Sequence, residues 1–212
     1  MTNLPKAIIA MSDVREVSMI NGLEDTPRNK LLSAAAHLFK TKGFERTTVR
    51  DLAKEVGIQS GSIFHHFKTK QDILYSLMVE VIKFNTERML EAMSKVDNSQ
   101  DKLLALIECE LISINGETSE AMAVLVYEWR SLSEENQQKV LALREQYEQL
   151  WLDVIQDLHD QQQVSVVPFI LRRLLTGAIS WTINWYQPKG ALNIEELATM
   201  VLQMAVSQPV KS

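Results

Sequence analysis

Apolar residues recur every three or four positions along most of the chain, which is the spacing of helices that bury one face. No stretch alternates between apolar and polar residues for long enough to predict a β-strand, and no internal repeat is visible. Residues 1–26 have no sustained period, so we expect them to form a flexible N-terminal arm. The pattern therefore predicts an all-α protein of about nine helices.

Capping residues and glycines mark the ends of the first helices. Thr26 and Pro27 form a helix start, and Gly43 ends that helix. Residues 48–51 (Thr-Val-Arg-Asp) form a variant of the capping box that opens a second helix, which Gly57 ends. Further helices are expected over residues 60–66, from residue 70 onward, and over residues 100–114, 117–132, 134–160, 167–186 and 193–206.

Residues 49–66 combine two short helices with a glycine-containing turn, which predicts a helix-turn-helix unit braced by the helix before it. The second helix of such a unit lies in the major groove of DNA. Gly57 permits the positive φ that the turn needs. Ile58, Ile63 and Phe67 are spaced to pin the second helix to the core. The residues left facing outward are Gln59, Ser60, Ser62 and His65.

Charge is distributed unevenly along the chain. Residues 27–70 carry a net charge of +6, whereas residues 1–26 carry −2 and residues 71–212 carry −9. A compact basic segment attached to an acidic body indicates that one end of the molecule meets a polyanion.

Several other classes of protein are disfavoured. The only cysteine, Cys109, allows no intramolecular disulfide, and no uncharged apolar run is long enough to span a membrane, so we expect a cytoplasmic protein. No phosphate loop, HExxH motif or nucleophile elbow is present, so we expect neither catalytic residues nor a metal or cofactor. Glu108, Glu110 and Glu128 are expected to be solvated or to cap helices. A helical enzyme and a non-DNA-binding adaptor remain as alternatives.

The stretch AAAHLFKTKGFERTTVRDLAKEVGIQSGSIFHHFKTKQDIL, residues 34–74, resembles the N-terminal domain of TetR-family transcriptional regulators. The similarity lies in the order and spacing of the LF…KGF…TTVRDLAKEVG run and of the following G-x-x-x-G-x-aliphatic-aromatic-x-H-F core. It implies a three-helix DNA-binding head at residues 27–74 and a larger helical effector and dimerisation body at residues 75–212. It further implies a homodimer that usually acts as a repressor on a near-palindromic operator.

The resemblance also implies which head residues meet DNA. Some positions match the family's phosphate contacts, and others match the edge of the recognition helix that reads bases or the aromatic-x-His cluster beside it. The implied phosphate contacts are Thr48, Arg50 and Lys70, the reading edge is Ser60, Gly61 and Ser62, and the cluster is Phe64, His65 and His66.

Two residues depart from the family pattern. Phe64 replaces the usual tyrosine, so no hydroxyl can donate to a phosphate there. Gln59 replaces a Ser or Thr cap and adds an amide that can pair with adenine. His65 and His66 point about 100° apart on a helix, which disfavours a metal pair. We expect His65 to face DNA and His66 to be part-buried as a brace.

The second half of the chain contains aromatic and arginine side chains that have two interpretations: core and dimer seam, or an apolar effector cavity with polar anchors. Trp181 and Trp185 are expected to share a helix face, and Gly177, Ala178 and Ser180 would allow close helix packing. The residues that would bind an effector are Trp129, Arg130, Arg172, Arg173, Trp181, Asn184 and Trp185.

Partners of the body follow from the resemblance. The last two long helices are similar in place to the pair that forms the family's dimer interface. Some family members with a similar ending respond to acyl-CoA thioesters, and Arg130, Arg172 or Arg173 could pair with phosphates of such a ligand. Another lipophilic compound is the competing choice. Arg144 and Tyr147 are expected to be surface residues. The effector is expected to act on the head through the fourth helix.

Overall fold

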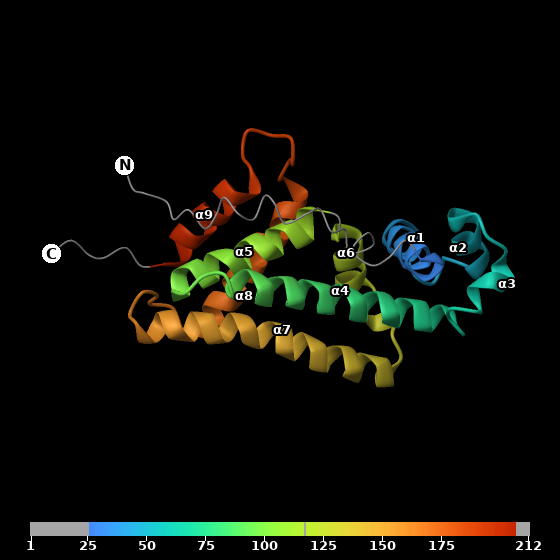
Figure 1. Ribbon diagram of the computed structural model, residues 1–212, viewed down its shortest axis with the longest axis horizontal. Helices are drawn as coiled ribbons and strands as arrows, with labels where there is room; N and C mark the ends of the chain where they lie inside the picture. The colour runs from blue at the N-terminus through green and yellow to red at the C-terminus, as the bar shows by residue number, and fades with distance from the viewer. Residues whose placement is uncertain (1–25, 117, 207–212) are drawn as a thin grey trace. The chain divides into compact units, whose positions relative to one another are not determined.

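The computed structural model describes residues 26–116 and 118–206, and all regular structure in these ranges is helical (Figure 1). The chain divides into two compact units, and two of the boundaries between them fall inside long helices, after Phe84 and after Glu145, while another follows Gly116. We call residues 26–84 and 118–145 the head unit, and residues 85–116 and 146–206 the body unit. The predicted all-α fold with about nine helices is confirmed.

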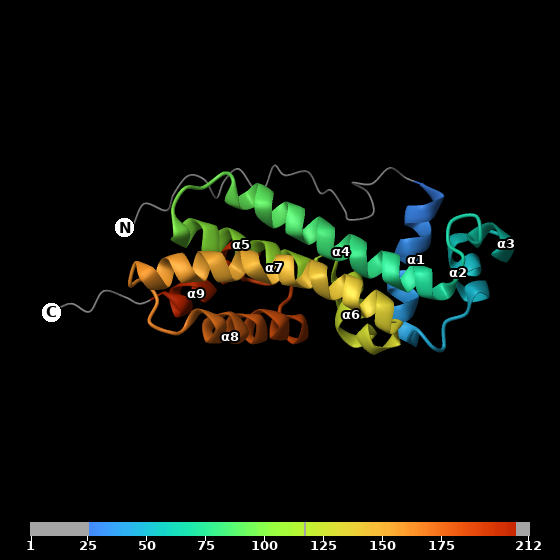
Figure 2. The same ribbon diagram turned by 90° about the horizontal axis from the view of Figure 1, so that it is seen from below.

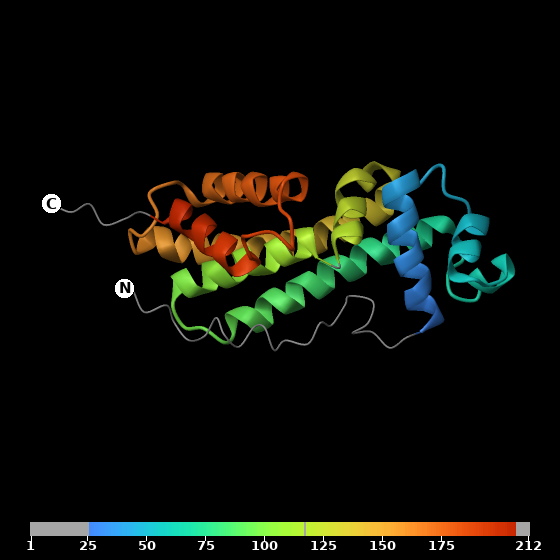
Figure 3. The ribbon, with the colours of Figure 1, turned by 90° about the horizontal axis from the view of Figure 1, so that it is seen from above.

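The head unit is built on α1, against which α2 and α6 pack, and α3 packs on α2 (Figure 3). Its helices are α1 (Pro27–Lys42), α2 (Val49–Val56), α3 (Ser60–Ile63), the first part of α4 (Lys70–Met93), α6 (Ser119–Tyr127), the 3₁₀ helix η2 (Trp129–Ser131) and the first part of α7 (Glu134–Asp160). The sequence placed α6 in the second domain, whereas its contacts with α1 group it with the head.

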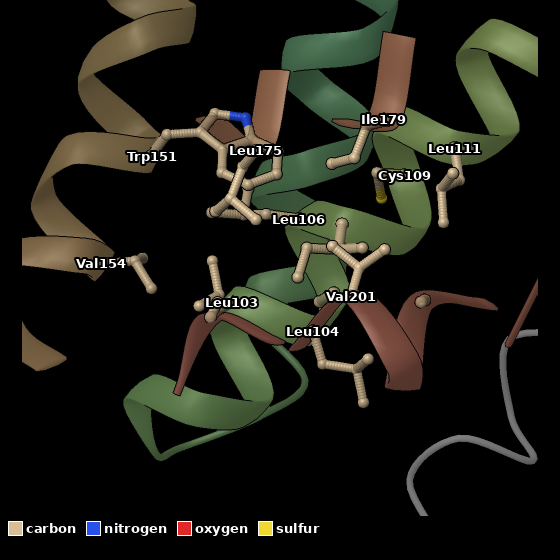
Figure 4. Packing of buried hydrophobic residues seen from close by; sticks show 14 of the residues in the cluster. Leu103, Leu104, Leu106, Cys109, Leu111, Trp151, Val154, Leu175, Ile179 and Val201 are labelled. Carbon is tan, nitrogen blue, oxygen red and sulfur yellow. The ribbon is translucent and has the colours of Figure 1, made fainter. Parts of the chain in front are cut away.

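The body unit has α5 (Ser99–Asn115) at its centre, with α8 (Pro168–Trp181) and α9 (Ile194–Ala205) packed against it (Figure 2). Nearly every residue of α5 from Leu103 to Leu111 is buried, so this helix contributes to the core on all sides. Figure 4 shows its side chains gathered with Trp151 of α7, Leu175 of α8 and Val201 of α9.

The predicted helix starts and stops in the head are confirmed. The Thr26 hydroxyl accepts a hydrogen bond from the Asn29 amide, and Thr48 and Asp51 form a reciprocal capping box. Gly43 and Gly57 end their helices with φ of +87° and +78°, a region that side chains with a Cβ atom disfavour.

Two expected helices are interrupted. The segment expected at residues 117–132 is α6 followed by η2, and the one expected at residues 167–186 ends as α8 at Trp181 before the 3₁₀ helix η3 (Thr182–Asn184). The buried Thr182 hydroxyl donates to the Ile179 carbonyl at 2.6 Å, a local bond that competes with a continuing helix. Trp181 and Trp185 therefore do not share the face of one α-helix, and that prediction is wrong.

Candidate nucleic-acid interface and effector residues

Two buried side chains fix the short helix α3 to the head unit. Ile63 ends α3 and is 1% exposed, and Phe67 follows at 5%. The Ile58 amide donates to the Ala53 carbonyl at 2.9 Å and holds the turn before α3, where Gly57 supplies the left-handed conformation. This is the geometry of a helix-turn-helix whose second helix is anchored on one side.

The outer edge of α3 is open to solvent. Phe64 is 54% exposed, so its ring is available for contact with another molecule. The Gln59 side chain makes no hydrogen bond that caps α3, as expected from its replacement of a Ser or Thr cap. At this edge Gln59, Gly61, Phe64 and His65 are exposed, and Ser60 and Ser62 are half-buried.

His66 is exposed, so the prediction of a part-buried brace is wrong. The α-helical part of α3 ends at Ile63, and the His66 amide donates to the Ile63 carbonyl at 2.9 Å in a tighter turn. The next residue, Phe67, is buried, as its spacing from Ile63 predicts, and its amide donates to the Ile63 carbonyl at 3.0 Å.

The start of α2 is fixed by contacts inside the head unit. The Thr48 hydroxyl accepts from the Asp51 amide at 3.1 Å and donates to the Asp51 carboxylate at 2.8 Å. The Lys42 ammonium lies 2.6 Å from the same carboxylate, and these contacts hold the pKa of Asp51 well below its usual value. Thr48 and Arg50 are both exposed, and their contact with phosphate stays a prediction.

Lys70 has different partners from those expected. Its ammonium donates to the carbonyls of Phe44 and Thr47 at 2.7 and 2.9 Å, and the Glu45 carbonyl lies at 3.4 Å. The same ammonium lies 4.2 Å from the centre of the Phe44 ring. The three N–H donors are thus directed to the turn after α1, and a phosphate would have to compete with these carbonyls.

A buried ion network joins three helices of the body unit. The Arg172 guanidinium on α8 donates to Glu110 of α5 at 3.1 Å and to Glu148 of α7 at 3.0 Å. It also lies 4.0 Å from the centre of the Trp151 ring, and Arg173 reaches Glu148 at 3.4 Å from a more exposed position. Two carboxylates already occupy the Arg172 fork, so the expectation that it pairs with ligand phosphates is corrected.

Three glutamates expected to be solvated or capping differ in their surroundings. Glu108 is 3% exposed, its Oε1 has no hydrogen-bond partner among the described residues, and burial, then the nearby Glu195, raises its pKa to about 7. Glu110 is 4% exposed, and burial raises its pKa although Arg172 opposes the rise. The half-buried Glu128 caps the turn after α1 by accepting from the Phe44 amide at 3.0 Å. The solvated interpretation is therefore wrong for Glu108 and Glu110.

Tyr147 was expected on the surface, but its hydroxyl is buried. Burial, then the charge of Glu110, raises the pKa of this hydroxyl well above its ordinary value. Arg144 is exposed, as expected, with its guanidinium 5.4 Å from the centre of the Trp129 ring.

The seven candidate effector residues are divided between the two units. Trp129 and Arg130 belong to η2 in the head unit, and the other five belong to the body unit. Trp181 is 66% exposed and Trp185 49%, so neither lines an enclosed cavity within its unit. The residues assigned to the body unit are Arg172, Arg173, Trp181, Asn184 and Trp185.

Large apolar side chains are exposed on α8 and α9 of the body unit, and we call this set of residues the α8–α9 face. Large apolar side chains with about half or more of their surface exposed are unusual in such number on an isolated unit. Gly177, Ala178 and Ser180 are also exposed on α8. The large apolar members of the face are Phe169, Ile170, Leu174, Trp181, Met200 and Met204.

The pairing of Glu110 and Glu148 with Arg172 was not predicted from the sequence. The available signal was a charged residue inside an otherwise apolar run, as in LLALIECELISI around Glu110 and FILRRLL around Arg172. A buried carboxylate is stabilised by pairing with a buried cation, so two runs of this kind with opposite charges favour a contact between them.

Within the described residues, no group of three or more His, Cys, Asp or Glu side chains could hold a metal ion. No helix in those residues combines the length and apolar character needed to cross a membrane.

A helix-turn-helix head with an exposed reading edge, joined to a second helical unit, is typical of DNA-binding transcriptional regulators. Residues 31–77 match the family described as "Bacterial regulatory proteins, tetR family", and residues 96–208 match "Tetracyclin repressor-like, C-terminal domain". The chain belongs to the TetR family. Members of this family are transcriptional regulators and not enzymes.

Several characterised proteins are similar over most of their length. The HTH-type transcriptional repressor KstR2 of Mycolicibacterium smegmatis is 25% identical over 193 residues, covering 86% of this chain and 93% of that protein. The solved structure "Crystal structure of superantigen pfit" is 52% identical with a TM-score of 0.78, covering 87% of this chain and 91% of the other. AibR in complex with isovaleryl coenzyme A and operator DNA has a TM-score of 0.75 at 20% identity, covering 84% and 97% respectively, and shows the common fold.

Proposed function

We propose that this regulator is a ligand-responsive repressor that binds a near-palindromic operator as a homodimer in the cytoplasm. The observation that carries the proposal is the outer edge of α3, where Gln59, Phe64 and His65 are exposed above the buried anchors Ile63 and Phe67. A helix anchored on one side and exposed on the other, in a segment with a net charge of +6, suits insertion into the DNA major groove.

Different head residues take different parts in this contact. The Gln59 amide can accept from and donate to an adenine edge, and the Phe64 ring can pack on a thymine methyl or a sugar. Arg50 and Thr48, exposed at the start of α2, would contact phosphates and set the orientation of the head. Ser60, Gly61, Ser62 and the two exposed histidines would lie along the same groove.

The homodimer would form through the α8–α9 face. Burial of its large apolar side chains would remove them from water, and the small residues Gly177, Ala178 and Ser180 would let two helices approach closely. Two heads related by twofold symmetry would then read half-sites about 34–36 Å apart.

The effector is proposed to be lipophilic, with an acyl-CoA thioester as the first class to test. The fold neighbour AibR was solved with isovaleryl coenzyme A, which makes this class a reasonable probe. Arg172 is an unfavourable phosphate contact because Glu110 and Glu148 neutralise it, so the exposed Arg130 and Arg173 are the better candidates among the arginines.

The experiment that tests DNA binding starts from genomic fragments retained by the purified protein, which are sequenced and then titrated at several salt concentrations. We expect nanomolar binding to a near-palindrome whose affinity falls steeply as salt rises. The Gln59→Ala variant should change the preferred base at one position in each half-site, whereas Glu145→Gln, at an exposed residue of α7, should leave the preference unchanged. Absence of any salt-dependent, sequence-selective binding would favour a non-DNA-binding adaptor instead.

A further inference from the structure

A closed ring of hydrogen bonds connects three segments of the head unit. The Phe44 amide donates to Glu128 Oε1 at 3.0 Å, and the Phe44 carbonyl accepts from Lys70 at 2.7 Å. Gln71, the residue after Lys70, donates to the Ser131 carbonyl at 2.5 Å, and the Ser131 hydroxyl donates to Glu128 Oε2 at 2.7 Å. The ring therefore joins the turn after α1, the start of α4 and η2.

The ring is partly shielded from water, which makes its bonds stronger than surface contacts. Phe44 is 3% exposed, and Gln71, Glu128 and Ser131 are half-buried. Both carboxylate oxygens of Glu128 are used, one toward the turn and one toward η2. Glu128 is thus the member through which the turn after α1 meets η2 directly.

The turn that Glu128 holds is the support of the DNA-reading elements. It ends at Thr47, which is fully buried, and its hydroxyl donates to the Gly43 carbonyl at 2.8 Å. The next residue, Thr48, caps α2, and α2 packs on α3. A displacement of Phe44 would therefore change the position of α2 and of the edge that reads bases.

The other end of the ring lies in a deformable element that contains two of the expected effector residues. Trp129 and Arg130 stand between Glu128 and Ser131 in η2, and Arg130 is exposed. A 3₁₀ helix has poorer hydrogen-bond geometry than an α-helix, so η2 can be displaced at lower cost than α6 or α7.

We propose that Glu128 couples η2 to the turn at Phe44, so that a contact on Trp129 or Arg130 changes the setting of α2 and α3. This inference rests on the proposed function, because it specifies how an effector signal reaches the DNA-reading edge. It adds a direct route through η2 to the route through α4 that the sequence suggested. Glu128 acts here as a positioning residue and does not itself touch DNA or ligand.

The first test needs no effector. Amide hydrogen exchange of the full chain is compared among wild type, Glu128→Ala, Trp129→Ala and the double variant. We expect the Phe44 amide to exchange roughly tenfold faster in Glu128→Ala, as for loss of one hydrogen bond in a partly buried site. In the wild-type background, Trp129→Ala should alter amide exchange at Phe44 and in α2. In the Glu128→Ala background, the same substitution should have little further effect. Independent, additive effects of the two substitutions would overturn the coupling.

The second test measures regulation. Operator affinity is determined with and without isovaleryl-CoA and palmitoyl-CoA for wild type, Glu128→Ala, Glu128→Gln and the control Glu145→Gln. For a probe that lowers the operator affinity of wild type severalfold, we compare the ratio of affinities without and with the probe. We expect this ratio to fall toward one in Glu128→Ala and to be intermediate in Glu128→Gln, which keeps one acceptor. Unchanged release in Glu128→Ala overturns the proposal. If neither probe releases wild type, the proposed effector class fails, and the exchange cycle still decides the coupling.

Discussion

The guanidinium of Arg172 lies 3.1 Å from the carboxylate of Glu110, and both side chains are almost completely buried. The adjacent Arg173 makes a similar contact with Glu148 but keeps 56% of its side chain exposed. Two neighbouring arginines on one helix thus differ both in burial and in partners, because Arg172 also bonds Glu148 and lies over the Trp151 ring.

We expect Arg172→Ala to lower the free energy of unfolding by about 3–5 kcal/mol, because it leaves Glu110 charged and buried without its partner. Arg173→Ala should cost no more than about 1 kcal/mol, since solvent screens its pair. Urea denaturation followed by circular dichroism measures both. Equal losses of unfolding free energy in the two variants would show that the buried Arg172–Glu110 pair contributes no more to stability than the exposed Arg173–Glu148 pair.

Glu108 predicts a pH dependence of stability. Its pKa rises from 4.5 to about 7 because of burial and Glu195, so between these values the folded state binds more protons than the unfolded state. Stability should therefore fall as pH rises through this window, by on the order of 2 kcal/mol after allowance for partial solvation. Unfolding titrations from pH 4.5 to 8 should show this slope in wild type and in Glu145→Gln. Glu108→Gln should have a shallower slope, because only Glu108 is removed and the pKa of Glu110 is also raised, and it should be the more stable protein at pH 8.

The α8–α9 face predicts the oligomeric state. Leu174 is 61% exposed on α8, and a glutamate in its place would put a charge into the proposed apolar interface. We expect wild type to sediment as a dimer and Leu174→Glu as a monomer at micromolar concentration. Leu141→Glu, at a leucine that is 44% exposed on α7, is the control and should remain dimeric. A dimeric Leu174→Glu protein would place the interface elsewhere.

Lys70 distinguishes an internal role from a phosphate contact. Because its ammonium donates to Phe44 and Thr47, we expect Lys70→Ala to lower the melting temperature of the protein by several degrees. Operator affinity should then fall for all sequences without a change in its salt dependence. A phosphate contact would instead reduce the slope of log affinity against log salt by about one unit.

The part of the fold that depends on local signals could be predicted from the sequence. Thr26, Gly43, Thr48 and Gly57 mark helix ends because caps and left-handed turns need particular residue types at particular positions. The buried anchors of α3 followed from spacing for the same reason. The TetR-family assignment also depended on this local order, and the family match confirms it.

What could not be predicted depends on contacts between distant residues. No local pattern shows that Glu128 would meet the Phe44 amide 84 positions away, or that α6 would pack with α1. The Thr182 hydroxyl at the interruption after Trp181 also accepts from the side-chain amide of Asn115, on another helix, at 2.8 Å. Tertiary partners of this kind override helix periodicity, and the local pattern of residues does not reveal them.

Cys109 lies in the core of the body unit at 1% exposure, and it is the chain's only cysteine. Burial raises the pKa of its thiol to about 11, so hardly any thiolate forms at neutral pH while the protein stays folded. A thiol-reactive dye can therefore modify Cys109 only when α5 becomes accessible. The reaction rate measures the frequency of these openings, and no cysteine has to be introduced. The rate of Cys109 modification thus reports how often the core of each subunit opens to solvent.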